Sequence, residues 1–396
     1  MSAKKIKAHF VGIGGIGVSA LARYYLAQGH MVSGSDLVAS EITQALQKKG
    51  VKISIGKNIF PKDADLIIYS PAITVRRPTS NMLSYPQALG ELTKKHFTIA
   101  VSGTHGKTTT VAMIGLILIK AGLDPTVIVG TKVKEFGDSN FRLGKSKYLV
   151  IEACEYDESF LNYEPQIIVI TNIEAEHLDY FKTFQNVLKA FRQFAEKLPE
   201  DGALINEKKY QNAKDASKLR KILKVPGAYN VANALAALST ARALKIPDEI
   251  SYRSLAEYTG SWRRFEERKV RGLTVVSDYG HHPTQIKATL RAARDKWLHK
   301  EIWCIFQPHQ YQRTYYLFDD FVQVFKEAPV DKLIITDIYD VAGREEKKIR
   351  EQVSAEKLIG SINQQWASYV AKDRIIDYLK KNLKGDEAVI FMGAGD

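Results

Sequence analysis

Short apolar runs alternate with segments of helical periodicity along this chain. The pattern begins in residues 8–36, where a β-type run leads into a glycine-rich turn, then a segment with apolar residues at every third or fourth position, and then a second β-type run that ends at Asp36. Residues 64–73 have the composition of another strand of the same sheet. Strands separated by helices predict a parallel, doubly wound sheet, in which ligands bind at the carboxyl ends of the strands.

Two further blocks repeat this plan. The second block has strand-like runs in residues 97–109, 147–155 and 166–174, and a helical segment in 230–244. The third block has a strand, a loop and a helix in residues 273–297, and further strands in 301–311, 332–340 and 387–396. The pattern therefore predicts an α/β protein of three domains, which we place at residues 1–97, 98–260 and 261–396.

The length and composition agree with several separate cores. The chain has 396 residues, of which 45% are hydrophobic, and single cores rarely grow beyond about 250 residues. No apolar run approaches the roughly 18 residues of a membrane span, and the first residues lead into a strand without a signal-peptide pattern. We therefore expect a cytoplasmic protein without a membrane partner. Cys154 and Cys304 lie in apolar runs, which predicts two buried free thiols.

The charge balance favours anionic ligands. Lys and Arg number 57 against 44 Asp and Glu, a net charge of +13, which would suit a nucleic acid or a small polyanion. The basic residues are scattered and show neither a basic arm nor zinc-finger spacing. We therefore expect small polyanionic ligands and no nucleic acid.

The first glycine-rich turn reads GIGGIG, with glycines at 12, 14, 15 and 17. It follows a strand and opens a helix, so its backbone N–H groups could face the diphosphate of a nucleotide. A simple strand–helix turn is the alternative, because this motif alone has low specificity. Asp36 ends the next strand, where dehydrogenases place the acidic ligand of a ribose. A nicotinamide-dependent dehydrogenase is therefore an alternative function at this point. It would not explain a second glycine loop, at residues 103–109.

The second glycine loop has the sequence GTHGKTT and predicts a phosphate-binding site. The strict phosphate-loop pattern fails because Val101 stands where its first glycine is expected. The chemistry is retained: backbone amides between Gly103 and Thr108 can bind phosphate oxygens, Lys107 adds a positive charge, and the Thr108 hydroxyl can bind Mg²⁺. An incidental glycine turn is the less favoured alternative.

Acidic residues gather at the ends of the two following strands. They are Glu152, Glu155, Asp157 and Glu158 after the first strand, and Glu174, Glu176 and Asp179, with His177, after the second. Mg²⁺ prefers carboxylate and phosphate oxygens, so these positions predict its protein ligands. Spacing alone does not decide which carboxylate binds the metal.

The chain resembles the Mur ligases of peptidoglycan synthesis over nearly its whole length. The resemblance is carried, in order, by GTHGKTTT, TNIEAEHLDYF, NVANALAAL, WRRFE, DYGHHPT, FQPHQYQRT and a terminal GAGD. It implies a Rossmann-like N-terminal domain that binds a UDP-sugar, a central ATPase-like domain with a phosphate loop, and a Rossmann-like C-terminal domain that binds nucleotide and amino acid. Within the family, the first glycine loop and the DYGHHPT and FQPHQYQRT motifs look most like the member that adds L-alanine to UDP-N-acetylmuramate. The murein tripeptide ligase of peptidoglycan recycling is the alternative.

The resemblance also implies a reaction and its residues. ATP, with Mg²⁺, would phosphorylate the lactyl carboxylate of UDP-N-acetylmuramate, and the amine of L-alanine would attack the acyl phosphate. The implied catalytic residues are Lys107, Glu152, His177, His281, His309 and Arg313. Those implied to bind ATP are Gly103, Thr104, His105, Gly106, Lys107, Thr108, Thr109, Asn233, Arg264 and Asp278, and the metal ligands are Thr108, Glu152 and His177. The UDP-sugar would contact Gly14, Gly15, Ile16, Gly17, Asp36 and Ser70.

Several positions depart from the family pattern. Glu176 stands where relatives usually have Asp, and Ser277 and Gln285 flank the DYGHHPT motif. The segment between residues 205–209 and 225–230 is short and rich in Lys, where relatives insert several strands. The central domain is thus expected to be abbreviated, and a scaffold that binds UDP-sugar or ATP without turnover is a second hypothesis. For the ligase we expect a monomer or a weak homodimer.

Overall fold

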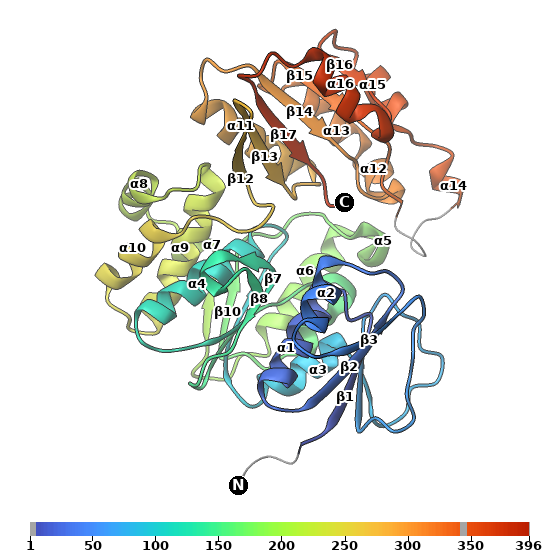
Figure 1. Ribbon diagram of the computed structural model, residues 1–396. Coiled ribbons are helices and arrows are strands. Elements are labelled where there is room, and N and C mark those ends of the chain that lie inside the picture. Colours follow the sequence, from blue (N-terminus) through green and yellow to red (C-terminus); the bar gives the residue numbers. More distant parts are fainter. Residues whose placement is uncertain (1–4, 341–346, 396) are drawn as a thin grey trace. The chain divides into compact units, whose positions relative to one another are not determined.

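The structure is a computed structural model that describes residues 5–340 and 347–395, without the side chains of residues 179 and 347 (Figure 1). The chain forms two compact units. The first consists of Met1–Glu176, Thr183–Leu219 and Asn233–Ala256, and the second of His177–Lys182, Arg220–Ala232 and Glu257–Asp396. Among the described helices, none has the length and apolar character needed to cross a membrane.

The first sheet, in the first unit, has five parallel strands in the order β3-β2-β1-β4-β5. Its elements are β1 (Lys7–Val11), α1 (Ile16–Ala27), β2 (Met31–Asp36), α2 (Glu41–Gln47), β3 (Lys52–Ile55), β4 (Leu66–Tyr69), β5 (Met82–Ser84) and α3 (Tyr85–Thr93). The chain reverses its direction of winding between β1 and β4, which is where sheets of this type bind ligands. The side chains of Ser40 and Ser84 cap α2 and α3 in reciprocal capping boxes.

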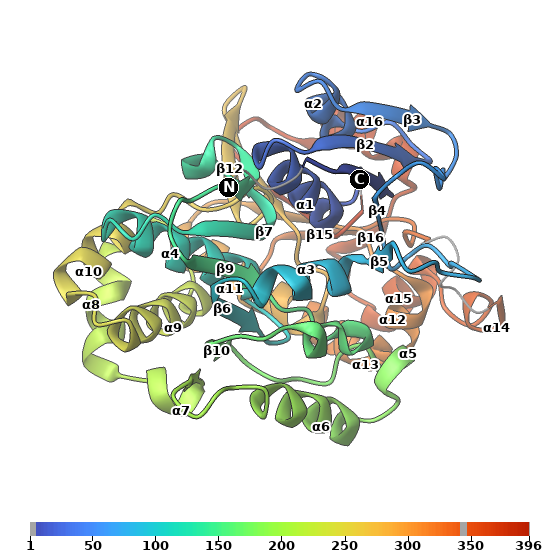
Figure 2. The same ribbon diagram turned by 90° about the horizontal axis from the view of Figure 1, so that it is seen from below.

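The second sheet, also in the first unit, has six strands in the order β11-β10-β6-β9-β7-β8. All neighbours are parallel except β7 and β8, and Figure 2 shows β6 between β9 and β10. Its elements are β6 (Phe97–Ser102), α4 (Lys107–Lys120), β7 (Thr126–Val133), η1 (Lys134–Phe136), β8 (Ser139–Arg142), β9 (Tyr148–Glu152), η2 (Tyr156–Asn162), β10 (Ile167–Ile170), α6 (Phe184–Ala195) and β11 (Ala203–Ile205). Every residue of β10 is buried, as expected for a strand covered on both faces.

The first two sheets pack together through α1 and α3. The side-chain amide of Asn140 on β8 donates to the carbonyl of Ile16 at 2.6 Å and to the hydroxyl of Ser19 at 2.9 Å, both on α1. On the other helix, Gly90 of α3 lies so close to Asn162 of η2 that a Cβ would be 2.4 Å from its carbonyl oxygen. These contacts join the first two sheets in one compact unit.

The third sheet, in the second unit, has the order β12-β13-β17-β14-β15-β16, in which only β12 is antiparallel to its neighbour. Its elements are β12 (Glu266–Val270), β13 (Leu273–Asp278), α11 (Pro283–Lys296), β14 (Ile302–Phe306), α12 (Tyr311–Tyr316), α13 (Phe318–Lys326), β15 (Lys332–Ile335), α14 (Lys347–Arg350), α15 (Ala355–Ile362), β16 (Ala367–Tyr369), η3 (Lys372–Arg374), α16 (Ile375–Asn382) and β17 (Ala388–Met392). α5 (Leu178–Phe181) also belongs to this unit.

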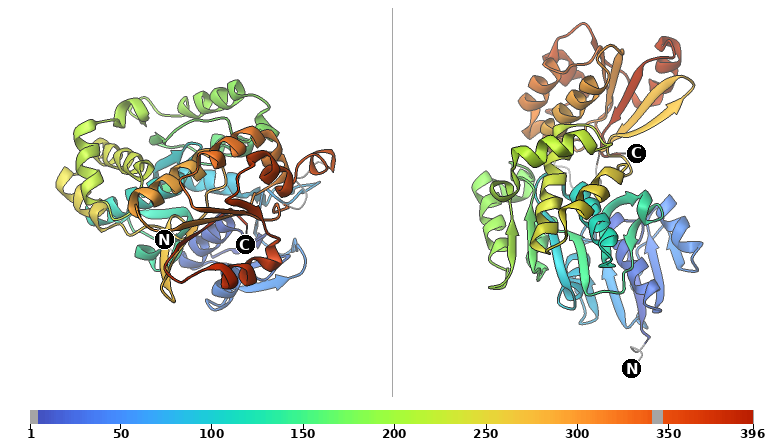
Figure 3. Two further views of the ribbon diagram at one scale, coloured as in Figure 1. Left: turned by 90° about the horizontal axis from the view of Figure 1, so that it is seen from above. Right: turned by 90° about the vertical axis from the view of Figure 1, so that its left-hand side faces the viewer.

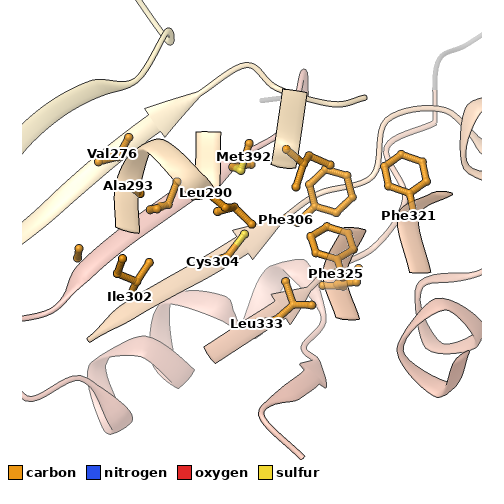
Figure 4. Packing of buried hydrophobic residues seen from close by; sticks show 14 of the residues in the cluster. Val276, Leu290, Ala293, Ile302, Cys304, Phe306, Phe321, Phe325, Leu333 and Met392 are labelled. Carbon is orange, nitrogen blue, oxygen red and sulfur yellow. The ribbon is translucent and has the colours of Figure 1, made fainter. Parts of the chain in front are cut away.

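Helices cover both faces of the third sheet (Figure 3). On one face, Phe306 of β14 packs against Phe321 and Phe325 of α13, with ring centroids 5.7 and 5.1 Å apart (Figure 4). On the other face, Ile375 and Leu379 of α16 pack on the sheet. The two buried faces of one sheet explain why β14 reads as a continuous apolar run.

Four helices follow the second sheet in the chain. They are α7 (Glu207–Tyr210), α8 (Ala213–Ile222), α9 (Ala228–Ala243) and α10 (Asp248–Glu257). The guanidinium of Arg242 on α9 donates to Asp215 on α8 and to Asp248 on α10, each at 2.7 Å. The hydroxyl of Tyr252 donates to the second oxygen of Asp215, also at 2.7 Å. This network ties the short Lys-rich segment to the helices that follow it.

The structure confirms the predicted α/β fold, with three mainly parallel sheets. It also confirms a buried Cys304, on β14, but the prediction of a buried Cys154 was wrong. Cys154 lies beyond the end of β9, in the loop that leads to η2, and is exposed. The apolar run was correctly identified, but it ends before this cysteine.

Candidate active site

The second glycine loop lies between β6 and α4, and its glycines are required by the backbone. Gly103 has φ +129° and Gly106 has φ +86°, conformations that other residues rarely adopt. A Cβ on Gly103 would be 2.1 Å from the hydroxyl of Thr171, and one on Gly106 would be 2.2 Å from the side-chain oxygen of Asn233. The loop is therefore packed against the end of β10 on one side and against α9 on the other. The predicted ligand Asn233 does lie beside the loop.

The residues after β10 hold the loop in place. Asn172 accepts from the backbone N–H of Thr104 through its carbonyl at 3.0 Å and from that of His105 through its side chain at 2.9 Å. The hydroxyl of Thr104 in turn accepts from the N–H of Glu174 at 2.8 Å. Two amides of the predicted phosphate cradle are thus already bonded. The first N–H groups of an α-helix have no acceptor within the helix, and α4 begins with Lys107, Thr108 and Thr109.

The ammonium of Lys107 makes contacts with the loop and with an acidic residue. It donates to the carbonyl of Gly103, to that of Thr104 at 3.2 Å, and to the carboxylate of Glu155 at 3.0 and 3.2 Å. Burial alone lowers the pKa of Lys107, but the carboxylates of Glu155 and Glu176, among other groups, more than offset this effect, and the pKa is raised overall. Lys107 is therefore a fixed positive charge at the N-terminus of α4.

Two of the three predicted metal ligands lie in the first unit. Thr108 is buried in the first turn of α4. Glu152 ends β9 and accepts from the N–H of Gly130 on β7 at 2.5 Å, and a Cβ on Gly130 would be 2.9 Å from either carboxylate oxygen. The third residue, His177, belongs to the second unit and caps α5 in a left-handed conformation with φ +56°.

The first glycine loop uses most of its amides internally. The N–H of Gly14 donates to the carboxylate of Asp36 at 2.7 Å, and that of Gly15 donates to the carbonyl of Gly12 at 3.0 Å. The contact of these two residues with a diphosphate stays a prediction from the sequence. The amides left by helix geometry are those of Ile16 and Gly17, the first residues of α1.

The remaining predicted UDP-sugar residues surround this loop. A Cβ on Gly12 would be 2.9 Å from that of Ser70, which follows β4. Ser70 also donates its backbone N–H to Val11 at 3.0 Å. On the opposite side, a Cβ on Gly17 would be 2.8 Å from the ring of Tyr85, the first residue of α3. The predicted residues thus meet at the winding reversal of the first sheet.

In the second unit, Asp278 ends β13 and its carboxylate is occupied by the protein. One oxygen accepts from the N–H of Phe265 at 2.8 Å, and the other accepts from the N–H of Gly280 at 2.8 Å and from the hydroxyl of Thr289 at 3.4 Å. Burial raises the pKa of Asp278, although Arg264 and these donors act in the opposite direction. Asp278 therefore joins the WRRFE and DYGHHPT motifs rather than presenting a free carboxylate.

The two arginines of the WRRFE motif flank Tyr279. The guanidinium of Arg264 lies 5.0 Å from the centre of the Tyr279 ring, and that of Arg263 lies 5.3 Å from it. Arg263 also donates to the carbonyls of Gly393 at 2.5 Å and Gly395 at 2.7 Å. It lines a cavity of about 400 Å³ near the carboxyl ends of β13, β14 and β17. The last residue of the GAGD motif, Asp396, lies outside the described residues.

The three residues predicted to contact the amino acid lie together. The ring of His309, after β14, lies 5.9 Å from that of His281, after β13. Arg313, on α12, donates to the ring Nδ1 of His309 at 3.2 Å and to its carbonyl at 3.1 Å. The ring of His309 is also stacked on Tyr339, with 5.3 Å between centroids and 8° between planes.

These hydrogen bonds fix the neutral forms of both histidines. A guanidinium only donates, so Nδ1 of His309 accepts and the proton of its neutral ring is on Nε2. His281 has the reverse arrangement, because its Nδ1 donates to the carbonyl of Tyr279 at 2.9 Å, which leaves Nε2 as the basic nitrogen. The pair therefore offers one nitrogen that can accept a proton and one that can donate one. The neighbouring His282 caps α11, because its Nδ1 accepts from the N–H of Thr284.

Several residues of this geometry were not identified from the sequence. Asn172 lies inside a quoted motif, but it was not recognised as the support of the phosphate loop. Tyr85 is the first residue of a capped helix, and a partly buried aromatic residue at such a position does not indicate a ligand site. Tyr339 follows β15 and is far in sequence from the histidine that it stacks on. Only the pairing of His309 with Tyr339 at the sheet edge brings it there.

Comparison with protein families gives three consecutive matches. Residues 7–97 match the Mur ligase family catalytic domain, residues 101–224 the Mur ligase middle domain, and residues 263–395 the Mur ligase glutamate ligase domain. The matches fall on the first, second and third sheets, respectively. The gap at 225–262 contains α9 and α10.

Curated relatives match almost the whole chain. A UDP-N-acetylmuramate–L-alanine ligase of Acetivibrio thermocellus is 41% identical over 98% of this chain and 93% of its own length. One of Caldanaerobacter subterraneus is 40% identical over 98% of this chain and 95% of its own length. Among solved structures, the UDP-N-acetylmuramate–alanine ligase of Thermotoga maritima is 27% identical with a TM-score of 0.78, over 99% of this chain and 96% of that one. A murein peptide ligase of Psychrobacter arcticus shares the fold, with a TM-score of 0.70 and 22% identity over 98% of this chain and 96% of that one.

The alignment with the A. thermocellus ligase is longer than the part of this chain that it covers. It spans 444 positions and uses 98% of 396 residues, or about 388 residues, so about 56 positions have no counterpart here. The abbreviated central domain stays a prediction from the sequence. In the structure, only α7 and α8 lie between β11 and α9.

Proposed function

This chain belongs to the Mur ligase family, and we propose that it is the ATP-dependent ligase that joins L-alanine to the lactyl carboxylate of UDP-N-acetylmuramate. The observation that carries this proposal is the identity of about 40% to UDP-N-acetylmuramate–L-alanine ligases over nearly the entire chain. The geometry of the phosphate loop and of the histidine–arginine cluster supports it, because both are formed by the residues that the reaction requires.

The nucleotide would be held by the loop of residues 103–109. The charge of Lys107 and the amides at the start of α4 suit the terminal phosphates of ATP, and Asn233 is placed beside Gly106 to line the same site. Positioning and charge neutralisation supply most of the acceleration in phosphoryl transfer. The resemblance to the family implies that Arg264 also contacts the nucleotide. Asp278 would act by holding the WRRFE segment through the N–H of Phe265.

Mg²⁺ fits the oxygen donors in the first unit. The hydroxyl of Thr108 and the carboxylate of Glu152 are of the type that Mg²⁺ selects, and the resemblance to the family adds His177 as a ligand. Bound Mg²⁺ would neutralise charge between the terminal phosphate and the substrate carboxylate. Glu152 is oriented for such a role by the N–H of Gly130.

The amino acid would lie against His281, His309 and Arg313. L-alanine must lose a proton from its ammonium before its amine attacks the acyl phosphate, and Nε2 of His281 is a nitrogen that can accept it. The guanidinium of Arg313 is held by His309, and its planar fork suits the carboxylate of the amino acid. The Nε2–H of His309 can donate to a developing oxyanion.

The UDP-sugar would lie at the winding reversal of the first sheet. The amides of Ile16 and Gly17 at the start of α1 would face its diphosphate, since those of Gly14 and Gly15 are occupied. Asp36 would act mainly by fixing the loop through Gly14, and Ser70 would border the site from the end of β4. A cytoplasmic location and a monomer or weak homodimer stay predictions from the sequence.

Two other functions are weaker candidates. The murein tripeptide ligase of peptidoglycan recycling is favoured only by a likeness of fold, at 22% identity. A scaffold without turnover is favoured by the deletion of about 56 alignment positions. The residues of the phosphate loop, Glu152 and the histidine–arginine cluster are all present, which favours an active ligase.

Phosphate release tests the proposal. The protein is incubated with ATP, Mg²⁺ and UDP-N-acetylmuramate, and L-alanine, glycine, L-serine or the tripeptide is added in turn. We expect release that requires both the UDP-sugar and an acceptor and is fastest with L-alanine. Equal release with every acceptor or with none would reject the ligase, and a preference for the tripeptide would assign the recycling activity.

A further inference from the structure

The ammonium of Lys107 has all three of its protons engaged. Its partners are the carbonyl of Gly103, the carbonyl of Thr104 at 3.2 Å and the carboxylate of Glu155 at 3.0 Å. The side chains of Lys107 and Glu155 are 16% and 3% exposed, so the pair is shielded from water. A lysine carries three donors, and a phosphate can therefore gain a direct bond from Lys107 only if one of these partners leaves.

The two carbonyls belong to a rigid part of the molecule. Gly103 is fixed by its left-handed conformation and its close approach to Thr171. Thr104 makes two hydrogen bonds: its backbone N–H donates to Asn172, and its hydroxyl accepts from the N–H of Glu174. Of the three partners, two are backbone carbonyls and one is the side-chain carboxylate of Glu155. The carboxylate can move by rotation about side-chain bonds, so it is the partner that can leave.

The backbone that carries Glu155 is of a kind that can rearrange. Asp157 and Glu158 have φ of +54° and +50°, two consecutive non-glycine residues in the left-handed region. On the far side the segment is anchored, because Phe160 is buried and stacks on Phe194 at 4.4 Å. Strain is thus confined to a short stretch between the strand end at Glu152 and the anchor at Phe160.

We propose that Glu155 is a placeholder anion, whose carboxylate occupies the Lys107 position of the phosphate loop until the terminal phosphates of a nucleoside triphosphate displace it. The inference rests on the proposed function for the identity of the nucleotide. The carboxylate of Glu155 and a phosphate would compete for the same buried ammonium of Lys107. A nucleotide must therefore break the ion pair between Lys107 and Glu155 before its phosphate can bind Lys107. Glu155 therefore lowers the affinity for the nucleotide, and binding moves the segment of residues 155–158.

Isothermal titration calorimetry with a non-hydrolysable ATP analogue tests this proposal. The titration uses the wild type, Glu155→Gln, Glu155→Asp and the control Glu164→Gln, which removes the same charge at an exposed position on the surface. We expect Glu155→Gln to bind the analogue about tenfold more tightly, the ratio that corresponds to one charge-assisted hydrogen bond. The gain should be the same with and without Mg²⁺, and Glu164→Gln should bind as the wild type does.

The alternatives give different results. If Glu155 is a metal ligand, Glu155→Gln weakens binding only when Mg²⁺ is present, and this overturns the proposal. Unchanged affinity overturns it as well. Glu155→Asp keeps the charge but shortens the side chain by one methylene, so tighter binding by this variant supports the proposal even if Glu155→Gln does not fold. A wild type that does not bind the analogue would count against the proposed function, whereas equal binding by all variants would count only against the placeholder.

Discussion

Arg313 donates to Nδ1 of His309 at 3.2 Å, a bond between two residues of the candidate amino-acid site. It places the proton of the neutral imidazole on Nε2, because a guanidinium only donates. His309 is further held by its stacking on Tyr339. The substrate carboxylate and the acyl centre would then meet donors whose positions are set before binding.

Replacing Arg313 by Lys should therefore affect the amino acid more than the nucleotide. The charge is kept, but the planar fork is lost, and the loss of one or two charge-assisted hydrogen bonds of about 1.5–3 kcal/mol each corresponds to at least tenfold in the KM for L-alanine. Steady-state kinetics with each substrate varied in turn measures this. The KM for ATP should stay as it is, and Arg291→Lys, at an exposed position of α11, should leave all constants unchanged.

The phosphate loop makes a prediction about glycine. Gly106→Ala introduces a non-glycine residue at φ +86° and a Cβ only 2.2 Å from the side-chain oxygen of Asn233. Gly29→Ala is a matched control, since Gly29 has φ +82° and nothing within 4 Å. The control should cost about 1–2 kcal/mol of unfolding free energy from conformation alone.

Gly106→Ala should cost more than this control, because Asn233 must move. Urea denaturation gives both unfolding free energies. The double variant Gly106→Ala, Asn233→Ala should recover part of the excess cost, as expected for two residues in contact. Equal costs for Gly106→Ala and Gly29→Ala would show that Asn233 does not restrain the loop.

Asp278 predicts a dependence of stability on pH. Its pKa is raised in the folded protein by burial, so the folded state binds the proton more tightly than the unfolded state does. The corresponding stabilisation is full below the ordinary aspartate pKa and is lost as pH rises through the raised value. Unfolding free energies measured across this interval should fall with rising pH in the wild type and fall less in Asp278→Asn.

The same variant should be less stable than the wild type at neutral pH. An asparagine can accept through one oxygen only, whereas both oxygens of Asp278 accept backbone N–H groups. An unsatisfied buried donor costs about 1–3 kcal/mol. Asp295→Asn, which changes an exposed carboxylate of α11, is the control and should unfold as the wild type does. A wild-type stability for Asp278→Asn would show that the carboxylate does not hold the WRRFE segment.

Lys107 provides the test of the nucleotide site. Lys107→Ala should lower the rate of phosphate release by at least about a hundredfold, because it removes a charge that stabilises the transition state. UDP-N-acetylmuramate should still bind, as measured by calorimetry, because its predicted contacts are in the first sheet. Lys49→Ala, at an exposed position, should retain full activity. If Lys107→Ala no longer binds UDP-N-acetylmuramate, the predicted location of the UDP-sugar site at the first sheet is wrong.

The sequence indicated the strands and both glycine loops because their signals are local. The run IIVI of β10 and the glycines at 103 and 106 follow from burial and backbone conformation, which neighbouring residues determine. The motifs near residues 281 and 309 also predicted which side chains gather after β13 and β14. Parallel strands bring their carboxyl ends to one edge, so residues far apart in sequence meet there.

The hydrogen bonds inside the site could not be predicted in this way. Asp36 and Asp278 are predicted ligand contacts, and in the structure both accept backbone N–H groups of nearby loops. An acidic residue at a strand end is compatible with either use, and the loop conformation decides between them. The sequence likewise did not indicate the pairing of Lys107 with Glu155 or the left-handed turn at 157 and 158, where it has no glycine.

In the proposed reaction, one oxygen of the lactyl carboxylate attacks the terminal phosphorus of ATP and ADP leaves. The amine of L-alanine then attacks the acyl carbon of the acyl phosphate, and inorganic phosphate leaves with that oxygen. UDP-N-acetylmuramate labelled with ¹⁸O in both oxygens of its lactyl carboxylate tests this directly, with mass spectrometry of the phosphate released in the presence of ATP, Mg²⁺ and L-alanine. An acyl-phosphate route transfers one labelled oxygen to each phosphate and leaves the other in the new amide. Phosphate without label would mean that water attacks ATP, and would contradict the ligase mechanism.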